Sequence, residues 1–343
     1  MKKTILATLA IASMMSCSNE ELLEAPAQQA ITFGNTFVEK APSTRAAYDG
    51  SYTTSSLTQF QVYGTITNTS GATGRVFTGE VVENKSGTWT LDGAAQYWIP
   101  GNTYNFWGIA DGNVQGATSV DAGEKNCVPQ TITVDASQQK DVLLATRTFK
   151  DYQTTHGTVV EFTFRHLMAK AKFTVKNTVS TDNDYNYVVE NIKIKTDKNG
   201  IYDVASGKWS LAEVEKTEEN SYELSFGNAV TEGTPAGAAA VAIGFDSKAE
   251  SNFDRLLIPN EYKADGSKKL TVTFTCVTRI GTTELRTETK EVTTENDVVL
   301  VQGHAYNFII SLSNPGEKIQ FTVTEVKDWE TNHEGYNPGV EIK

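Results

Sequence analysis

Histidines are the first side chains to consider for catalysis or metal binding in this chain. The sequence contains His156, His166, His304 and His333, and none has a second histidine at metal-ligand spacing. His166 lies between apolar strands in FTFRHLMAKAKFTV, and His304 lies in the turn QGHAYNF. We interpret these side chains as structural and hydrogen-bonded, and we predict no metal site and no cofactor.

Enzyme motifs are absent from the sequence. It contains no nucleophile elbow, zinc-protease helix, phosphate-binding loop or dinucleotide fingerprint. The glycine- and alanine-rich run at 233–245 lacks phosphate-loop spacing and predicts a loop leading into a strand. Glycosidase carboxylates are defined by their separation in space, so the sequence leaves that possibility open. We expect a protein that is not an enzyme.

Cys17 is the residue best placed for a covalent modification. It follows a basic start and an apolar stretch over residues 4–15, which is too short to span a bilayer. The sequence turns polar directly after it, in SNEE, and SCSNEE resembles a lipobox. We predict a signal peptide over residues 1–16 and an acylated Cys17 that anchors the chain in the outer membrane. The alternative is ordinary secretory cleavage, because Met14-Met15 departs from the commoner lipobox pattern.

Two further cysteines, Cys127 and Cys276, lie far apart in the sequence. Cys276 falls in the alternating run LTVTFTCVT, which predicts a small buried side chain. A disulfide between the two cannot be deduced from the sequence and stays open.

The charge balance bears on partners. The chain of 343 residues carries 42 acidic and 30 basic side chains, a net charge of −12. This disfavours nucleic acid, because nucleic-acid binding depends on positive charge meeting phosphate. The acidity suits a soluble, exported surface.

Period-two alternation of apolar and polar residues dominates the chain and predicts half-buried strands. Turn dipeptides such as Asn199-Gly200 and Pro315-Gly316 separate them. We therefore expect an all-β fold. The predicted strands include 57–67, 103–110, 130–136, 158–164, 170–177, 189–197, 269–278, 305–313 and 318–326.

A polar segment at 146–157 follows the apolar DVLLA and suggests a boundary. It would divide the mature chain into two β-sandwiches, 46–150 and 158–343, both of ordinary domain size.

Tryptophans are the candidate stacking platforms if the protein binds a glycan. The candidates are Trp89, Trp98, Trp107 and Trp209. Trp98 and Trp107 lie in apolar, strand-like surroundings, which favours core packing for both.

Several segments, taken in order, resemble the fimbrillin (Mfa-like) family, the lipoprotein pilins of Bacteroides-type bacteria. The resemblance covers most of the mature chain. It rests on SCSNEE, ITFGNTF with STRAA, LTQFQVYG, AAQYWIPGNTYNFWGIA, DVLLA, VVEFTFRHLMAKAKFTVKN and VLVQGHAYNFIISLSNPGEKIQFTVTEVKDWE.

The resemblance implies two tandem transthyretin-like antiparallel β-sandwich domains and a subunit of a surface fimbria. It also implies assembly by donor-strand exchange. In that scheme the strand 31–38 plugs a groove through Ile31, Phe33 and Phe37, with Val38 as a further candidate and an irregularity at Gly34-Asn35. An arginine-specific protease would cut after Arg45, make Ala46 the new N-terminus, and free the lipidated segment 17–45.

The donor end is less clearly marked in the sequence. After Trp329 only ETNHEGYNPGVEIK remains, a short tail that Pro338-Gly339 interrupts. The subunit could therefore be a tip or accessory subunit that accepts a strand without giving one, or the run 318–326 could act as the donor. Expected partners are other fimbrial subunits, the protease, the outer membrane and a glycan or host-protein ligand. The alternative function is a monomeric surface lipoprotein that binds such a ligand without polymerising.

Overall fold

The computed structural model of the protein describes residues 29–34, 36–38, 57–110, 118–123, 127–150, 158–179, 184–211, 221–235, 237–266, 268–313 and 318–326. Within these ranges the chain forms β-strands and a single 3₁₀ turn, η1 (Ala136–Gln138). No helix in the described ranges is long and apolar enough to cross a membrane. The prediction of an all-β fold is confirmed.

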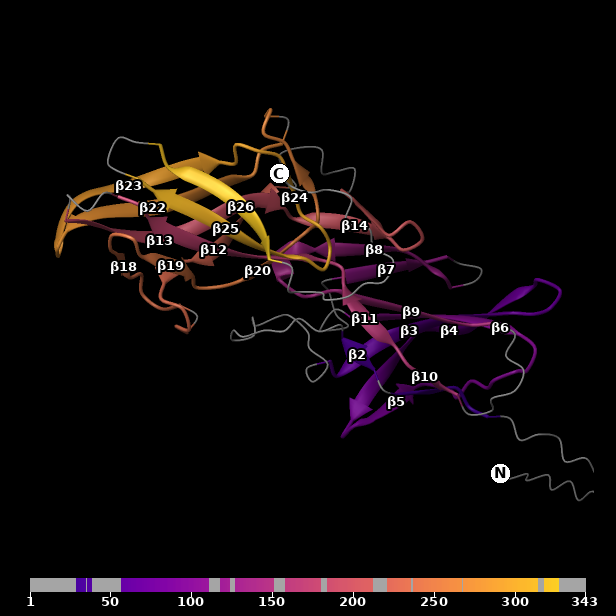
Figure 1. Ribbon diagram of the computed structural model, residues 1–343. Helices are drawn as coiled ribbons and strands as arrows, with labels where there is room; N and C mark the ends of the chain where they lie inside the picture. The colour runs from indigo at the N-terminus through magenta and orange to yellow at the C-terminus, as the bar shows by residue number, and fades with distance from the viewer. Residues whose placement is uncertain are drawn as a thin grey trace, which may run out of the picture.

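The N-terminal half is built around a seven-stranded sheet, together with a two-stranded parallel sheet (Figure 1). Its buried face holds a cluster rich in aromatic side chains, here called the N-terminal cluster, which includes Phe60, Phe77, Phe106 and Phe164. In order across the large sheet, the strands are β2 (Phe37–Val38), β11 (Thr163–His166), β9 (Leu143–Phe149), β6 (Thr103–Ala110), β3 (Gln59–Thr67), β4 (Thr73–Lys85) and β5 (Thr88–Asp92); the small sheet pairs β1 (Thr32–Phe33) with β10 (Val159–Val160).

The C-terminal half is a sandwich of two sheets. The first runs β17 (Ala229–Val230), β19 (Lys248–Ser251), β12 (Ala169–Asn177), β25 (Ala305–Leu312), β26 (Gln320–Val326), with β20 (Arg255–Leu257) also on β12. The second runs β16 (Ser221–Gly227), β13 (Tyr185–Asp197), β22 (Thr271–Ile280), β23 (Thr283–Thr293), with β18 (Ala242–Ile243) also on β13.

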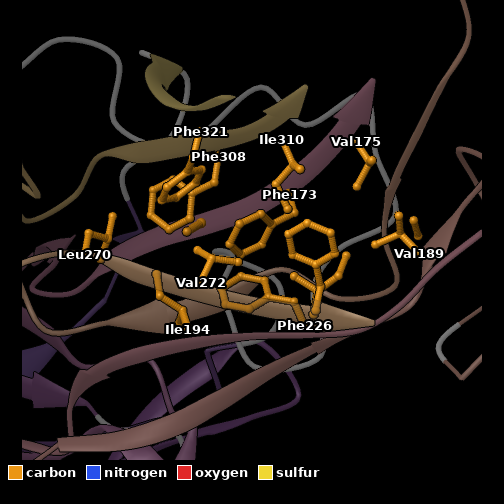
Figure 2. Packing of buried hydrophobic residues seen from close by; sticks show 14 of the residues in the cluster. Phe173, Val175, Val189, Ile194, Phe226, Leu270, Val272, Phe308, Ile310 and Phe321 are labelled. Carbon is orange, nitrogen blue, oxygen red and sulfur yellow. The ribbon is translucent and has the colours of Figure 1, made fainter. Parts of the chain in front are cut away.

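Apolar side chains from these two sheets meet in the C-terminal cluster, part of which Figure 2 shows. Phe173 on β12 lies at its centre, with its ring centroid 4.6 Å from that of Phe226 on β16 and 5.1 Å from that of Phe308 on β25. Alternation along each strand sends every second side chain into this layer, as the sequence predicts for a sandwich.

A smaller sheet joins the two halves. It runs β15 (Lys208–Ser210), β14 (Asn199–Asp203), β8 (Pro129–Asp135) and β7 (Thr118–Ala122), so two strands that follow the predicted boundary lie beside two strands that precede it. Figure 1 shows β7, β8 and β14 between the two halves. β21 (Glu261–Tyr262) and β24 (Val298–Val299) form a separate pair.

Hydrogen bonding crosses the predicted boundary at several places, including the pairs β1–β10 and β2–β11. β11 follows the boundary and pairs with β9 before it, and β8 before it pairs with β14 after it. Residues 151–157 lie outside the described ranges. The division into domains 46–150 and 158–343 therefore stays a proposal, and any such division must allow strands to be shared.

His166 forms a buried contact near this junction. Its Nδ1 lies 2.6 Å from Oδ2 of Asp141, and both side chains are almost completely shielded from solvent. The contact agrees with the interpretation of His166 as structural, because a buried carboxylate needs a charged or hydrogen-bonding partner. It fixes the end of β11 to the segment just before β9.

A turn and strand unit occurs twice in the fold, once in each half. The sequence IPGNTYNF precedes and begins β6, and VQGHAYNF precedes and begins β25. In the first copy the hydroxyl of Tyr104 accepts the backbone N–H of Ile99 at 2.7 Å, and in the second Tyr306 accepts that of Val301 at 2.8 Å.

The asparagine that follows each tyrosine accepts a hydrogen bond from a threonine hydroxyl in both copies. Asn105 accepts a hydrogen bond from the hydroxyl of Thr148 at 2.8 Å, and Asn307 accepts one from Thr174 at 2.9 Å. Gly101 and the equivalent glycine of the second copy have φ of 80° and 70°, which glycine adopts at little cost. The two halves therefore start a central strand with the same device.

We predict that Tyr104→Phe and Tyr306→Phe each lower the free energy of unfolding by about 1–3 kcal/mol, because each leaves a backbone N–H without its acceptor. Urea unfolding of the purified chain measures this. Tyr97→Phe is the matched control, since Tyr97 is exposed, and it should change the free energy by less than about 0.5 kcal/mol. Equal effects at all three positions would contradict the role of the buried hydroxyls.

Candidate strand-accepting site

Residues 29–34 form the middle strand of a three-stranded ribbon. On one side the backbone N–H of Ile31 donates to the backbone carbonyl of Gln96 at 2.7 Å. The backbone N–H of Trp98 donates to the backbone carbonyl of Gln29 at 2.9 Å. On the other side β1 pairs in parallel with β10, and Gly34 donates to the carbonyl of Val160 at 3.2 Å. A strand bonded along both edges is an interior strand.

The inward side chains of this strand belong to the N-terminal cluster. Ile31 and Phe33 are both buried, while Thr32 between them is exposed. The Phe33 ring centroid lies 6.0 Å from Phe60, 5.6 Å from Phe77 and 6.2 Å from Phe162. Phe33 therefore closes a group of aromatic rings that come from separate parts of the chain.

The alternation changes phase after Gly34, where the sequence predicts an irregularity. Thr36 and Val38 are buried, so even-numbered side chains now point inward. Close packing accounts for a glycine at position 34, because a Cβ there would lie 2.8 Å from Cγ1 of Val159. Phe37 lies in β2 opposite Thr163 of β11.

Loss of this strand would expose two kinds of surface at once. The edges at Gln96 and β10 would lose their backbone partners, and such edges accept a strand from another chain. Removing Ile31, Phe33 and Val38 would also open the aromatic core to water, at about 1.5–3 kcal/mol for each buried side chain. Any strand held at this site must therefore bond both edges and fill these buried positions.

Other predicted site residues lie outside the described ranges. These are Cys17, Arg45 and Ala46, together with the tail after residue 326. The candidate donor run 318–326 is described, and β26 pairs along β25 with Phe321 buried in the C-terminal cluster.

The sequence did not single out the residues that line this site. Phe60 and Phe77 contact Phe33 from β3 and β4, and Phe162 contacts it from the two residues that link β10 to β11. Their inward positions follow from alternation, but their approach to residue 33 depends on tertiary packing.

The remaining candidates from the sequence are structural. Trp98 is buried, and the indole N–H of Trp209 donates to the carbonyl of Leu167 at 3.0 Å. Trp89 and Trp107 are partly buried against apolar clusters. Cys127 and Cys276 are both free, and burial raises the pKa of the Cys276 thiol to about 11, so this thiol is unreactive at neutral pH.

Comparison with known proteins identifies the family. A family profile described as fimbrillin-like matches residues 44–329. The chain belongs to the fimbrillin-like family. The match begins one residue before Arg45, so the strand at 29–34 precedes the matched region of this fimbrillin-like chain. No curated protein matches it by sequence.

Solved structures agree with the fold of this fimbrillin-like chain. A fimbrial protein from Bacteroides vulgatus is 16% identical with a TM-score of 0.59, and covers 87% of this chain and 99% of its own. A candidate cell adhesion protein from Bacteroides ovatus is 17% identical with a TM-score of 0.51, and covers 90% of this chain and 100% of its own. At these identities the likeness shows the fold alone.

Phe33→Ala should lower the free energy of unfolding by about 3–5 kcal/mol, because it leaves a cavity among three aromatic rings. Denaturant unfolding of the uncut chain measures this. Thr32→Ala is the matched control on the same strand, and since its side chain is exposed the change should stay within about 0.5 kcal/mol. A loss below ~1 kcal/mol for Phe33→Ala would mean that the strand does not occupy this site in solution.

Proposed function

We propose that this protein is a subunit of a bacterial surface fimbria that is exported as a lipoprotein and assembled by strand exchange. Membership of the fimbrillin-like family supports the fimbrial role. The observation that carries the exchange proposal is the interior position of residues 29–34, which come shortly before Arg45 in the sequence and fill the aromatic core through Ile31 and Phe33.

Cleavage would change how this strand is held. In the uncut chain the strand is covalently linked to the fold, so its effective concentration at the site is high. After a cut at Arg45 it is held only by its hydrogen bonds and its few buried side chains. A strand supplied by a neighbouring subunit can then compete for the same edges and the same core positions.

The two candidate donor strands are β26 and the C-terminal tail. β26 would have to give up seven residue pairings with β25 and withdraw Phe321, whose ring centroid lies 6.0 Å from Phe308 and 6.1 Å from Phe173. The cost of releasing these contacts argues against β26 as the donor. The tail after residue 326, and an accessory subunit that accepts a strand without giving one, are the other two alternatives.

The alternative, a monomeric glycan-binding lipoprotein, gains no support from the tryptophans. Trp98 is buried and the other three are partly buried in the described fold. We therefore place the protein at the cell surface, as part of a fimbria, with other fimbrial subunits as its main partners.

Arg45→Ala should abolish assembly of this subunit into fimbriae. Because the strand at 29–34 stays covalently attached, it cannot be displaced efficiently by another. Purified fimbriae from cells expressing the natural chain should yield this subunit with Ala46 at its N-terminus, as read by N-terminal sequencing.

Lys40→Ala is the matched control, since it removes a cation five residues earlier in the sequence and leaves Arg45 in place. It should leave assembly unchanged. Fimbriae in which the subunit still begins at Cys17 would overturn the cleavage step, whatever the family.

Cys17→Ser should abolish lipid attachment, because the acyl chains have no thiol to join. Metabolic labelling with a radioactive fatty acid measures it, and Ser16→Ala, which keeps the thiol, should still be labelled. Label that persists on Cys17→Ser would contradict lipidation at this residue.

A further inference from the structure

The N-terminal strand carries one residue more than the chain it pairs with. Residues 29–38, of which residue 35 lies outside the described ranges, are here called the plug. Phe33 of the plug faces Val160, and Phe37 faces Thr163, so the plug has one extra residue between these two pairs. An extra residue of this kind is a β-bulge, and it reverses which side chains point inward on the strand beyond it.

The bulge turns the side chain of Thr36 into the protein. Before the bulge the buried side chains are Ile31 and Phe33, and after it they are Thr36 and Val38. Gly34 lies at the start of the bulge, where a Cβ would lie too close to Val159. A strand that takes the place of the plug must therefore repeat the bulge and supply an inward side chain at the position of Thr36.

Thr36 fills this inward position poorly. The residue is 5% exposed, and its hydroxyl oxygen has no hydrogen-bond partner among the residues that the structure describes. A buried hydroxyl that has lost its bonds to water and gained none in the protein destabilises the state that holds it. The amide oxygen of Gln29 is a second such atom, but that residue as a whole is only partly buried. A valine has nearly the shape of threonine without the hydroxyl, so it would fill this position at lower cost.

We propose that the buried hydroxyl of Thr36 weakens the hold of the plug on its site, and that the strand which replaces the plug carries an aliphatic side chain at this position. This proposal rests on the proposed strand exchange. The partner is a strand of a second subunit. It has an aliphatic residue, an aromatic residue and a glycine in the places of Ile31, Phe33 and Gly34, and a second aliphatic residue in the place of Val38.

The cost of the hydroxyl matters only after cleavage. In the uncut chain the covalent link keeps the effective concentration of the plug high, so the plug stays in place in spite of Thr36. After a cut at Arg45 the plug and an incoming strand compete through their affinities. Removal of one unpaired buried hydroxyl is worth about a tenfold gain in affinity, or ~1.4 kcal/mol. The exchange then runs toward the incoming strand.

The same rule excludes β26 as the replacement. Residues 319–326 resemble part of the plug in sequence, with IQFTVTEV against ITFGNTFV. They place Thr322 in the position of Gly34, where its Cβ would meet Val159. They also place Thr324 in the position of Thr36, so that a hydroxyl would again be buried there. β26 would therefore gain nothing over the plug.

Peptide exchange on the purified full chain tests the proposal. Residues 41–46 are replaced by the recognition site of a sequence-specific protease, so that one cut releases the plug without the natural protease. The cut chain is incubated with fluorescent peptides of residues 29–38, and the concentration that displaces half of the plug is measured. The Thr36→Val peptide should need about tenfold less than the peptide of natural sequence.

The Thr32→Val peptide is the matched control. It makes the same chemical change on the same strand, but at an exposed position. Its half-displacement concentration should stay within about twofold of the natural value. An equal gain for both peptides would show that apolar character alone improves binding, and it would overturn the proposal, as would no gain for Thr36→Val.

The uncut chain supplies a second measurement. Thr36→Val should raise the equilibrium constant between folded and unfolded chain about tenfold in urea unfolding, and Thr36→Ser, which keeps the hydroxyl, should give no gain. A loss of stability in Thr36→Val would mean that the hydroxyl has a partner, and would overturn the proposal.

The outcomes separate this proposal from the proposed function. If the natural peptide enters the cut chain and Thr36→Val gains nothing, strand exchange stands and the role of Thr36 is wrong. If no peptide enters, the natural one included, strand exchange at this site is wrong and the role of Thr36 in it is wrong as well.

Discussion

Burial of Phe33 among Phe60, Phe77 and Phe162 is the contact on which the N-terminal half depends. The three partners come from β3, β4 and the two-residue link between β10 and β11, so the ring of a short N-terminal strand completes a core made by other parts of the chain. Hydrogen bonds along both edges hold that strand in register. Under the proposed strand exchange, a replacement strand must fill these same positions, and this requirement links the core to assembly.

The site also depends on the junction between the halves. β11 pairs with β2 on one edge and β9 on the other, and its His166 is joined to Asp141 in a buried contact. Next to it, the pairing of β8 with β14 ties the two halves through backbone hydrogen bonds. β11 is therefore held in place from both edges and through the side chain of His166.

One outer strand of the described fold is poorly suited to pairing with another chain. β23 is the outer strand of its sheet, and it carries Arg286, Glu288 and Lys290 in ion pairs along its exposed surface. Charged side chains on an edge oppose pairing with another chain. Charge on β23 therefore protects this edge, whereas the N-terminal strand at 29–34 lies beside an apolar core.

The sequence by itself determined the all-β class, the bounds of β6, β22 and β25 to within two residues, and the inward faces of Ile31, Phe33 and Cys276, because period-two alternation decides which way a side chain points. It did not predict β4 or β23, whose polar residues lie on half-exposed strands where alternation is weak. Only the tertiary structure decided that residues 29–34 are an interior strand, that β11 joins β9 across the predicted boundary, and that the tyrosines of two distant turns play the same role. Alternation specifies the face of a strand, whereas its partner depends on contacts between residues far apart in the chain, such as Phe37 with Thr163.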